Sequence, residues 1–284
     1  MKLAVIVHRW DQFDPIPAGQ PKGPRPSPYL LFDVLEAWRV MGHEWAIATP
    51  DRPVEADAAF LHAVPTVVDA EHRQLADQYP GTINGATWDI SKRRVSRNLL
   101  AADSGWTGPV IVKSDLNNFG KIEQLHNLRA AEAGEEPPHR DLPRSTDYRL
   151  YARLDQVPQA LWDDSGLVVE KFLPEQNDDG SYTLRTWVFL GGRERCTRLV
   201  GPNPVSKAAH VLHYEPAEVP DALRAERARL GFDYGKFDFV IHDGVPVLLD
   251  ANRTPGNPRS LQEHVKKGAA NLAEGLDELL RNGR

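Results

Sequence analysis

The sequence predicts a fold of mixed class, α/β and α+β, in which a small parallel α/β domain at the N-terminus is followed by two further lobes. Two patterns support this prediction. Over roughly the first 85 residues, short apolar runs rich in β-branched residues alternate with amphipathic helical segments, which is typical of a parallel sheet. Later in the chain, two pairs of apolar segments are each joined by a short glycine-containing turn, which is typical of antiparallel strands.

The elements of the N-terminal domain have local signals in the sequence. After a proline-rich loop, Ser27 is placed to cap a helix, Pro28 suits its first turn, and Gly42 ends it. One face of this helix is apolar at α-helical spacing, with Leu31, Val34, Leu35 and Trp38. The other expected elements are strands at 2–8, 45–49, 59–62 and 82–84 and a helix at 69–79.

The remaining elements form the two lobes. The polar segment 123–147 carries two adjacent prolines, so we expect it to be mobile or to form a lid. Ser260 and Glu263 form a capping box for a final helix. The other expected helices are 91–102, 155–162 and 220–230, and the expected strands are 110–113, 167–173, 182–190, 195–201 and the arms of a hairpin, 237–241 and 245–249. The predicted units are 1–90, 91–175 and 176–284.

Composition argues against several classes of protein. The chain has 284 residues and a formal net charge of −6, whereas a dedicated nucleic-acid binder needs a basic surface. It contains no apolar run near the ~18 residues that a membrane span requires, so we expect no membrane association. The single cysteine, Cys196, rules out an internal disulfide and a cysteine-built zinc site, and it fits a reducing, cytoplasmic compartment.

The most informative stretch is the hairpin at 237–252, which carries two carboxylates and an amide. Because side chains alternate between the faces of a strand, Asp250 and Asn252 share one face. Asp238 joins that face if the turn holds an odd number of residues, for example a three-residue turn with Gly244 in the left-handed conformation. Hard oxygen ligands placed in this way suit one or two Mg²⁺ ions. The alternative is that both aspartates are solvated carboxylates at the ends of apolar strands.

These three residues, followed by Thr-Pro-Gly at 254–256, resemble the metal-binding end of the ATP-grasp superfamily. There, an aspartate precedes a glutamate-x-asparagine motif that ends in proline-glycine. The resemblance covers roughly residues 1–260 in the expected order, and it is nearest to glutathione-synthetase-like and D-alanine–D-alanine-ligase-like enzymes. It implies a small α/β domain followed by a two-lobed ATP-grasp fold, with an N-terminal lobe at 91–175 and a C-terminal lobe at 176–284.

The resemblance implies ATP as cofactor, with Mg²⁺ as its metal and Mn²⁺ as an alternative ion. Two lysines would contact the nucleotide, a hinge strand would bind adenine through its backbone at Lys171 and Leu173, and an acid shortly after that strand would hold the ribose. The implied nucleotide-binding residues are Lys92, Lys113, Glu170, Lys171, Phe172, Leu173, and Glu175 or Asp178; the implied metal ligands are Asp238, Asp250 and Asn252.

The resemblance also implies a chemistry. Enzymes of this superfamily activate a carboxylate as an acyl-phosphate, which an amine, thiol or hydroxyl then attacks. Arg185 resembles the arginine that faces the γ-phosphate, and its guanidinium fork suits phosphate oxygens. Arg198 and Arg253 are the candidates for binding the carboxylate that is activated. We therefore expect small-molecule carboxylate and amine substrates, such as amino acids or peptides, with neither nucleic acid nor membrane as partner; a homodimer is allowed.

Three departures from the family pattern keep other functions open. Asp250 stands where the family usually has glutamate, the phosphate loop at 117–121 has the single glycine Gly120, and Leu184 replaces a frequent aspartate before Arg185. A non-catalytic or regulatory ATP-binding module and a small-molecule kinase are therefore the alternatives. Taken singly, each implied lysine or arginine is equally consistent with an ordinary surface side chain. His210 and His213 match no motif of the family.

Overall fold

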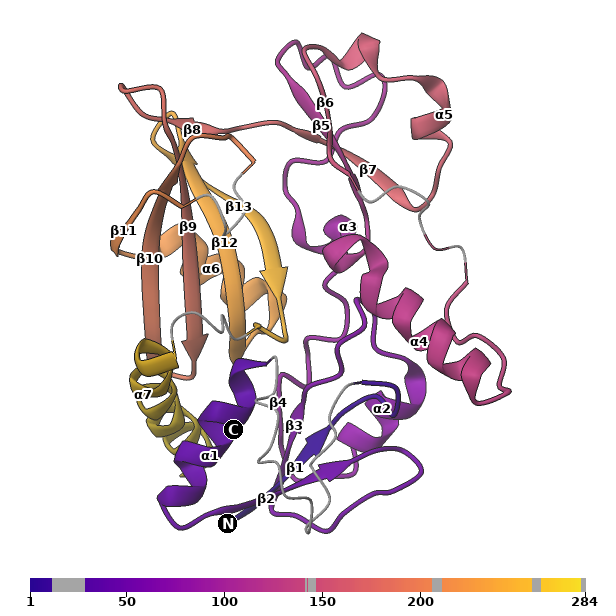
Figure 1. The fold of residues 1–284 in the computed structure, drawn as a ribbon, viewed down its shortest axis with the longest axis vertical. Coiled ribbons are helices and arrows are strands. Elements are labelled where there is room, and N and C mark those ends of the chain that lie inside the picture. Colours follow the sequence, from indigo (N-terminus) through magenta and orange to yellow (C-terminus); the bar gives the residue numbers. More distant parts are fainter. Residues whose placement is uncertain (12–28, 141, 143–146, 206–210, 257–261, 282–284) are drawn as a thin grey trace.

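The structure, a computed structural model, describes residues 1–11, 29–140, 142, 147–205, 211–256 and 262–281. Three sheets organise these residues (Figure 1): a parallel sheet of the N-terminal domain, a three-stranded antiparallel sheet, and a larger antiparallel sheet. The predicted mixed fold class, with a parallel N-terminal domain before antiparallel lobes, is confirmed. The domain boundaries at 90/91 and 175/176 remain a prediction.

The parallel sheet has the strand order β2-β1-β3-β4. Its elements are β1 (Lys2–Ile6), α1 (Leu30–Val40), β2 (Glu44–Ala48), β3 (Ala58–Leu61), α2 (Ala70–Ala76) and β4 (Thr82–Ile83). The predicted apolar face of α1 is buried from Leu31 to Trp38. Asp69 caps α2 by accepting from the backbone N–H of His72 at 3.0 Å. The predicted caps of α1, Ser27 and Pro28, lie outside the described residues.

The three-stranded sheet has the order β6-β5-β7 and is antiparallel. Its region contains α3 (Lys92–Val95), β5 (Val110–Ser114), the 3₁₀ turn η1 (Asn117–Gly120), α4 (Lys121–Glu132), β6 (Arg149–Tyr151), the 3₁₀ turn η2 (Leu154–Gln156), α5 (Gln159–Trp162) and β7 (Leu167–Lys171).

One helix predicted in this region is corrected by the structure, and a second segment contains a helix that was not predicted. The helix expected at 91–102 is a single turn, α3, because the chain after it runs alongside β7: Leu99 bridges to Glu170, and the N–H of Leu100 donates to the carbonyl of Val169 at 2.9 Å. The polar segment expected to be mobile begins with the helix α4. His126 and Ala130 of α4 are buried, so packing overrides the weak helical pattern of this segment.

The large sheet has the order β11-β10-β9-β12-β13, with β8 paired to β9. Its elements are β8 (Glu175–Gln176), β9 (Tyr182–Leu190), β10 (Arg193–Gly201), β11 (His213–Pro216), α6 (Asp221–Leu230), β12 (Tyr234–His242) and β13 (Val245–Asn252). One face of the sheet packs against α6 through Trp187, Phe189, Phe237 and Phe239. The opposite face therefore remains for the other lobes, and it carries the candidate site.

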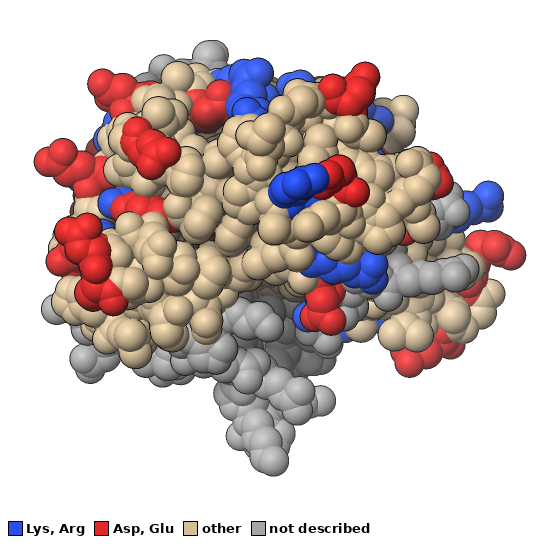
Figure 2. All heavy atoms as spheres, turned by 90° about the horizontal axis from the view of Figure 1, so that it is seen from above, with Lys and Arg blue, Asp and Glu red and all other residues tan. Residues whose placement is uncertain are grey.

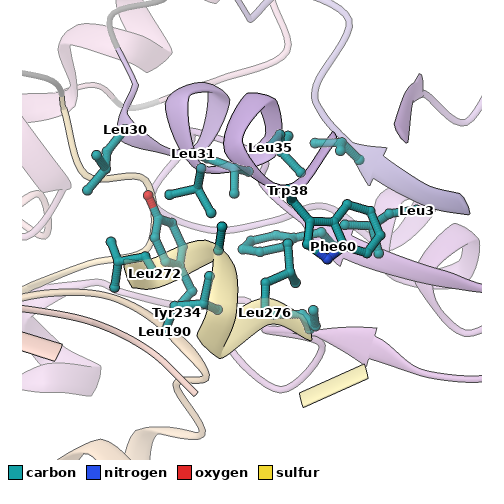
Figure 3. Close-up of a cluster of buried hydrophobic side chains, with 14 of the residues drawn as sticks. Leu3, Leu30, Leu31, Leu35, Trp38, Phe60, Leu190, Tyr234, Leu272 and Leu276 are labelled. Carbon is teal, nitrogen blue, oxygen red and sulfur yellow. The ribbon is translucent and has the colours of Figure 1, made fainter. Parts of the chain in front are cut away.

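The helix α7 (Gln262–Arg281) packs against α1, so it lies beside the N-terminal domain (Figure 1). Figure 3 shows Leu272 and Leu276 of α7 in one cluster with Leu31 and Trp38 of α1, together with Tyr234 of the large sheet. A single core thus joins the first domain to the large sheet. The predicted capping serine, Ser260, lies outside the described residues.

Charged side chains are mixed on the surface. Figure 2 shows acidic and basic groups interspersed over the face at the top of Figure 1, without a continuous basic area on that face. None of the helices in the described ranges is both long and apolar enough to cross a bilayer.

Four histidines cluster where α4 meets the N-terminal domain. The ring of His8 stacks on those of His126 and His72, with centroids 4.2 and 5.1 Å apart, and His139 lies beside His126. Asp11, whose side chain is almost fully buried, contacts His126 Nε2 at 2.9 Å. These contacts dock α4 on the loop that follows β1. Parallel rings direct their nitrogen lone pairs along parallel planes, so they do not converge on one metal ion.

This cluster predicts a loss of stability in acid. Burial, reinforced by His126 and His72, lowers the pKa of His8 from its ordinary 6.5 to about 3. Between pH 6.5 and about pH 3, His8 is protonated in the unfolded chain but neutral in the folded protein. Protonation therefore favours unfolding, so the free energy of unfolding is unaffected by the titration of His8 above pH 6.5 and falls as the pH drops below it. From pH 7 to pH 5, wild type is expected to lose about 2 kcal/mol more unfolding free energy than His8→Gln. Urea unfolding measures this, with His213→Gln as control; equal pH slopes in wild type and His8→Gln would contradict it.

Candidate functional site

The hairpin at 237–252 forms as predicted, but a different device aligns its carboxylates. The turn has two residues, Asp243 and Gly244, both with positive φ, and His242 pairs directly with Val245. A two-residue turn alone would put Asp238 and Asp250 on opposite faces. A β-bulge at Leu249 shifts the register, so Asp238 lies directly opposite Asp250. The shared face is confirmed, and the three-residue turn proposed to produce it is replaced by the bulge.

Each of these carboxylates forms an ion pair with a lysine. Lys92 Nζ lies 2.6 Å from Asp250 Oδ1, and Lys236 Nζ lies 2.7 Å from Asp238 Oδ2. Thr186 Oγ1 donates to Asp238 Oδ1 at 3.0 Å. Sequence reasoning missed Lys236, although strand alternation was a sufficient signal: it precedes Asp238 by two residues and therefore shares its face. Two acids and two ammonium groups are thus concentrated at one point of the large sheet.

The pKa values at this point follow from the pairing. Burial opposes ionisation of Asp250, but Lys92, followed by Lys236 and Lys113, outweighs burial and holds the Asp250 pKa below its ordinary value. Burial likewise opposes the charged forms of Lys92 and Lys236, yet Asp250 and Asp238, respectively, raise the pKa of these lysines. Asp250, Lys92 and Lys236 are therefore charged at neutral pH, which suits a site for a metal ion and phosphate oxygens.

Two cavities meet at these residues. The first, of about 330 Å³, is bordered by the 117–119 turn, Tyr29, Val64, Asn252 and Thr254, and we call it the turn cavity. The second, of about 160 Å³, is bordered by Lys113, Phe172, Leu173 and Asp238, and we call it the hinge cavity. Lys92, Tyr148 and Asp250 line both. Asp250 thus borders both cavities, and Asp238 borders the hinge cavity.

The hinge cavity is bordered by some of the residues that were predicted to bind the nucleotide. Phe172 and Leu173 border it, and Lys113 enters it from β5 while its Nζ lies 2.6 Å from Glu170 Oε2. The other carboxylate oxygen of Glu170, Oε1, is buried and has no hydrogen-bond partner in the described part of the chain. A buried acceptor without a donor is costly, so this oxygen suits the amino group of a bound base.

The Lys171 side chain points away from this cavity. Its ammonium lies 4.8 Å from the ring centroid of Trp106, and its backbone N–H donates to the carbonyl of Asn98 at 2.9 Å. The side chain therefore takes part in a cation–π contact on the far side of the hinge strand.

The turn expected from the sequence to be a phosphate loop has an unusual backbone. Asn118, Phe119 and Gly120 are all left-handed, with φ of 45°, 60° and 69°. For a bulky residue such as Phe119 this conformation is strained, by about 1–3 kcal/mol, and such strain concentrates at functional sites. Two non-glycine residues thus adopt a left-handed backbone that is usual for glycine.

The acids expected at the ribose lie apart from the cavities. Glu175 forms an ion pair with Arg185 and accepts from the backbone N–H of Ile241 at 2.5 Å. Asp178 is exposed in the turn between β8 and β9. Neither borders the hinge cavity in the described structure.

The structure does not bring Arg185 and Arg198 to the carboxylates. They lie directly opposite each other on β9 and β10, on the face that carries Trp187 and Cys196. Asp238 pairs with Thr186, the neighbour of Arg185, and successive side chains point to opposite faces. Arg185 therefore projects away from Asp238. Arg198 is held on the same side by Glu215 at 2.7 Å and by Thr183 Oγ1 at 3.0 Å.

Arg253 occupies the interior rather than the cleft. Its side chain is fully buried, and its guanidinium donates to the carbonyls of Ala63 at 3.1 Å, Pro65 at 2.5 Å and Thr87. These bonds tie the end of β13 to loops of the N-terminal domain. The expected contact with a substrate carboxylate is replaced by this structural role, because every nitrogen of the guanidinium is engaged.

The two histidines noted in the sequence are not among the described residues that border the cavities. His210 lies outside the described residues, and nearby in the sequence Asn203 borders the hinge cavity. His213 is largely exposed on β11, with Nε2 3.5 Å from Glu215.

The donor set at the hairpin fits magnesium. Within the described ranges, no group of three or more histidine, cysteine, aspartate or glutamate side chains is arranged to hold a metal. The candidate ligands are two carboxylates and an amide, which are hard oxygen donors of the kind that Mg²⁺ takes together with phosphate oxygens. Asn252 Oδ1 accepts from the N–H of Thr254 at 2.8 Å, which fixes this side chain on the ligand face.

Neither a protein-family model nor a curated protein sequence matches the chain. Solved structures match over nearly its whole length. D-cycloserine synthetase aligns with a TM-score of 0.54 and 15% identity, covering 99% of this chain and 100% of that chain.

Two further structures align with lower scores. The D-alanine–D-alanine ligase of Bacillus anthracis complexed with ATP has a TM-score of 0.49 and 14% identity, covering 99% of this chain and 97% of that chain. An ATP-grasp ligase complexed with a minimal precursor, Mg and ADP has a TM-score of 0.47 and 12% identity, covering 96% of each chain. At these identities the likeness concerns the fold, and the chain has the ATP-grasp fold.

Proposed function

We propose that this protein is an ATP-dependent ligase that joins a small carboxylate to an amine, or to a thiol, through an acyl-phosphate. The observation that carries the proposal is the pairing of Asp238 with Asp250 at the boundary of two cavities, with Lys92 and Lys236 beside them. Such a group of charges suits the transfer of a phosphoryl group between two bound anions.

The hinge cavity is the proposed nucleotide site. Phe172 and Leu173 would contact the base, and Lys113 would reach the α- and β-phosphates. Glu170, whose other oxygen pairs with Lys113, would accept a hydrogen bond from the base through Oε1. Asp238, Asp250 and Asn252 would hold Mg²⁺, which when bound offsets the phosphate charge. We leave the ribose contact unassigned, since Glu175 and Asp178 lie outside this cavity.

The turn cavity is the proposed site for the carboxylate substrate. Its volume of about 330 Å³ is near the lower end for small-molecule pockets, which suits an amino acid or a short peptide end. One substrate oxygen attacks the γ-phosphorus as ADP leaves, and the amine then attacks the carbonyl carbon and expels phosphate. Lys92, which borders both cavities, would face the transferring group, whereas Arg185 lies on the opposite face of the sheet from Asp238.

Release of ADP and phosphate tests this proposal. The protein would be incubated with Mg·ATP and a panel of amino acids, dipeptides and small carboxylates, singly and in pairs. A ligase releases equal ADP and phosphate only with a productive pair. A stable phosphorylated product without free phosphate would identify a kinase, and tight Mg·ATP binding without turnover would identify a regulatory module.

Lys113→Ala is expected to weaken ATP binding by about 10–100-fold, because it removes a charge-assisted contact to phosphate. Calorimetric titration with Mg·ATP measures the change. Lys171→Ala is the matched control, since that ammonium lies over Trp106 outside the cavity, and its ATP affinity should stay near wild type. Unchanged affinity in Lys113→Ala would count against the phosphate role.

A cytoplasmic location belongs to the same proposal. Cys196 is a free, buried thiol, and burial raises its pKa to about 11. A protonated thiol in a sheet is inert, which agrees with a reducing compartment and with a mechanism that needs no cysteine nucleophile.

A further inference from the structure

Tyr148 stands at the junction of the two cavities. It immediately precedes β6 and lines both the turn cavity and the hinge cavity, as do Lys92 and Asp250. The pair formed by these two residues carries the charge at the junction, and Tyr148 adds a hydroxyl there. A group that borders both spaces is placed where a phosphoryl group would pass from one bound molecule to the other.

The ring of Tyr148 also touches the strained turn. Its centroid lies 4.9 Å from that of Phe119, with the planes tilted by 48°. Phe119 has φ of 60°, a conformation that persists in a bulky residue only when surrounding contacts hold it. Aromatic pairs of this geometry stabilise their contact beyond the area that they bury. Tyr148 is therefore one of the contacts that fix the turn.

We propose that the Tyr148 hydroxyl donates a hydrogen bond to the terminal phosphoryl group of bound ATP, while its ring packs on Phe119 of the turn that borders the turn cavity. The inference rests on the proposed function, because it assumes that ATP occupies the hinge cavity. It deepens that function by naming a neutral donor for the group in transfer. A phenol remains protonated at neutral pH, so it donates to phosphate without adding charge.

The proposed contact involves only the γ-phosphate, so it can be tested by comparing a nucleotide that has this group with one that lacks it. Affinities for Mg·ADP and for the non-hydrolysable analogue β,γ-imido-ATP with Mg²⁺ would be measured by calorimetry in wild type, Tyr148→Phe and the control Tyr151→Phe. Tyr151 lies on the adjoining strand and packs under the small sheet, away from both cavities. Tyr148→Phe keeps the ring against Phe119 and removes only the hydroxyl.

Tyr148→Phe is expected to bind the triphosphate analogue about tenfold more weakly, with ADP affinity within about twofold of wild type. Tyr151→Phe should match wild type for both nucleotides. An unchanged ratio of the two affinities in Tyr148→Phe would overturn the inference while leaving the proposed function intact. Equal weakening of both would assign Tyr148 a structural role only. Failure of wild type to bind either nucleotide would instead refute the proposed function.

Discussion

Asp250→Asn is expected to lower Mg·ATP-dependent turnover by about 10²–10³-fold while leaving the protein folded. The change preserves the shape of the side chain but removes one negative charge from the proposed metal site. It also leaves Lys92, whose side chain is only 6% exposed, without its ionic partner. Asp238→Asn should have an effect of similar size, because Asp238 lies directly opposite Asp250. Steady-state release of ADP measures both.

The control for these variants is Asp243→Asn. Asp243 lies in the turn of the same hairpin, its side chain is 92% exposed, and asparagine tolerates its positive φ of 49°. It should retain wild-type turnover. Circular dichroism would establish that all three variants are folded. Wild-type activity in both Asp238→Asn and Asp250→Asn would refute the metal assignment.

Arg253→Met is expected to cost about 3–5 kcal/mol of unfolding free energy. Methionine fills much of the volume, but the carbonyls of Ala63, Pro65 and Thr87 lose their donors in a buried region. Burial already lowers the pKa of this guanidinium to about 10, since the charge is removed from water. Chemical denaturation at pH 7 measures the loss.

Arg39→Met is the matched control for this variant. Arg39 is exposed on α1 and pairs with Glu36 on the same helix, so its replacement should change stability by no more than about 0.5 kcal/mol. If Arg253→Met unfolded at the same denaturant concentration as Arg39→Met but lost affinity for a carboxylate substrate, the structural role of Arg253 would be wrong.

The hairpin shows what the sequence could predict. Its turn and its two aspartates were readable because strand alternation and the Asp-Gly turn are local rules. The bulge at Leu249 could not be predicted, because a bulge depends on how β12 and β13 pair over their whole length. The shared face of Asp238 and Asp250 was therefore correctly expected for a different geometric reason.

Arg185 and Arg253 show where local rules stop. Strand alternation predicts that Arg185 and Asp238 share a face only when the pairing of β9 with β12 is known, and the structure pairs Asp238 with Thr186. Nothing in the residues around Arg253 indicates that loops from about 190 positions earlier supply its acceptors. Both arginines were placed by analogy, and long-range contacts decide their roles.

The strained backbone at 118–119 and the docking of α4 likewise could not be predicted from the sequence. A single glycine at Gly120 gave no sign that Asn118 and Phe119 would adopt left-handed conformations, because such strain exists only when tertiary contacts hold it. The weakly amphipathic α4 becomes a helix by burying His126 against Asp11, a contact across 115 positions.

The most direct test of the central claim, an acyl-phosphate formed from a bound carboxylate, is the transfer of oxygen from substrate to phosphate. Each amino acid, dipeptide and small carboxylate of the panel would be supplied with both carboxylate oxygens as ¹⁸O, together with an amine and Mg·ATP. The released phosphate would then be examined by mass spectrometry. The account predicts that a productive pair gives one ¹⁸O atom in each phosphate released. Phosphate free of ¹⁸O, or no turnover with any member of the panel despite tight binding of Mg·ATP, would contradict it.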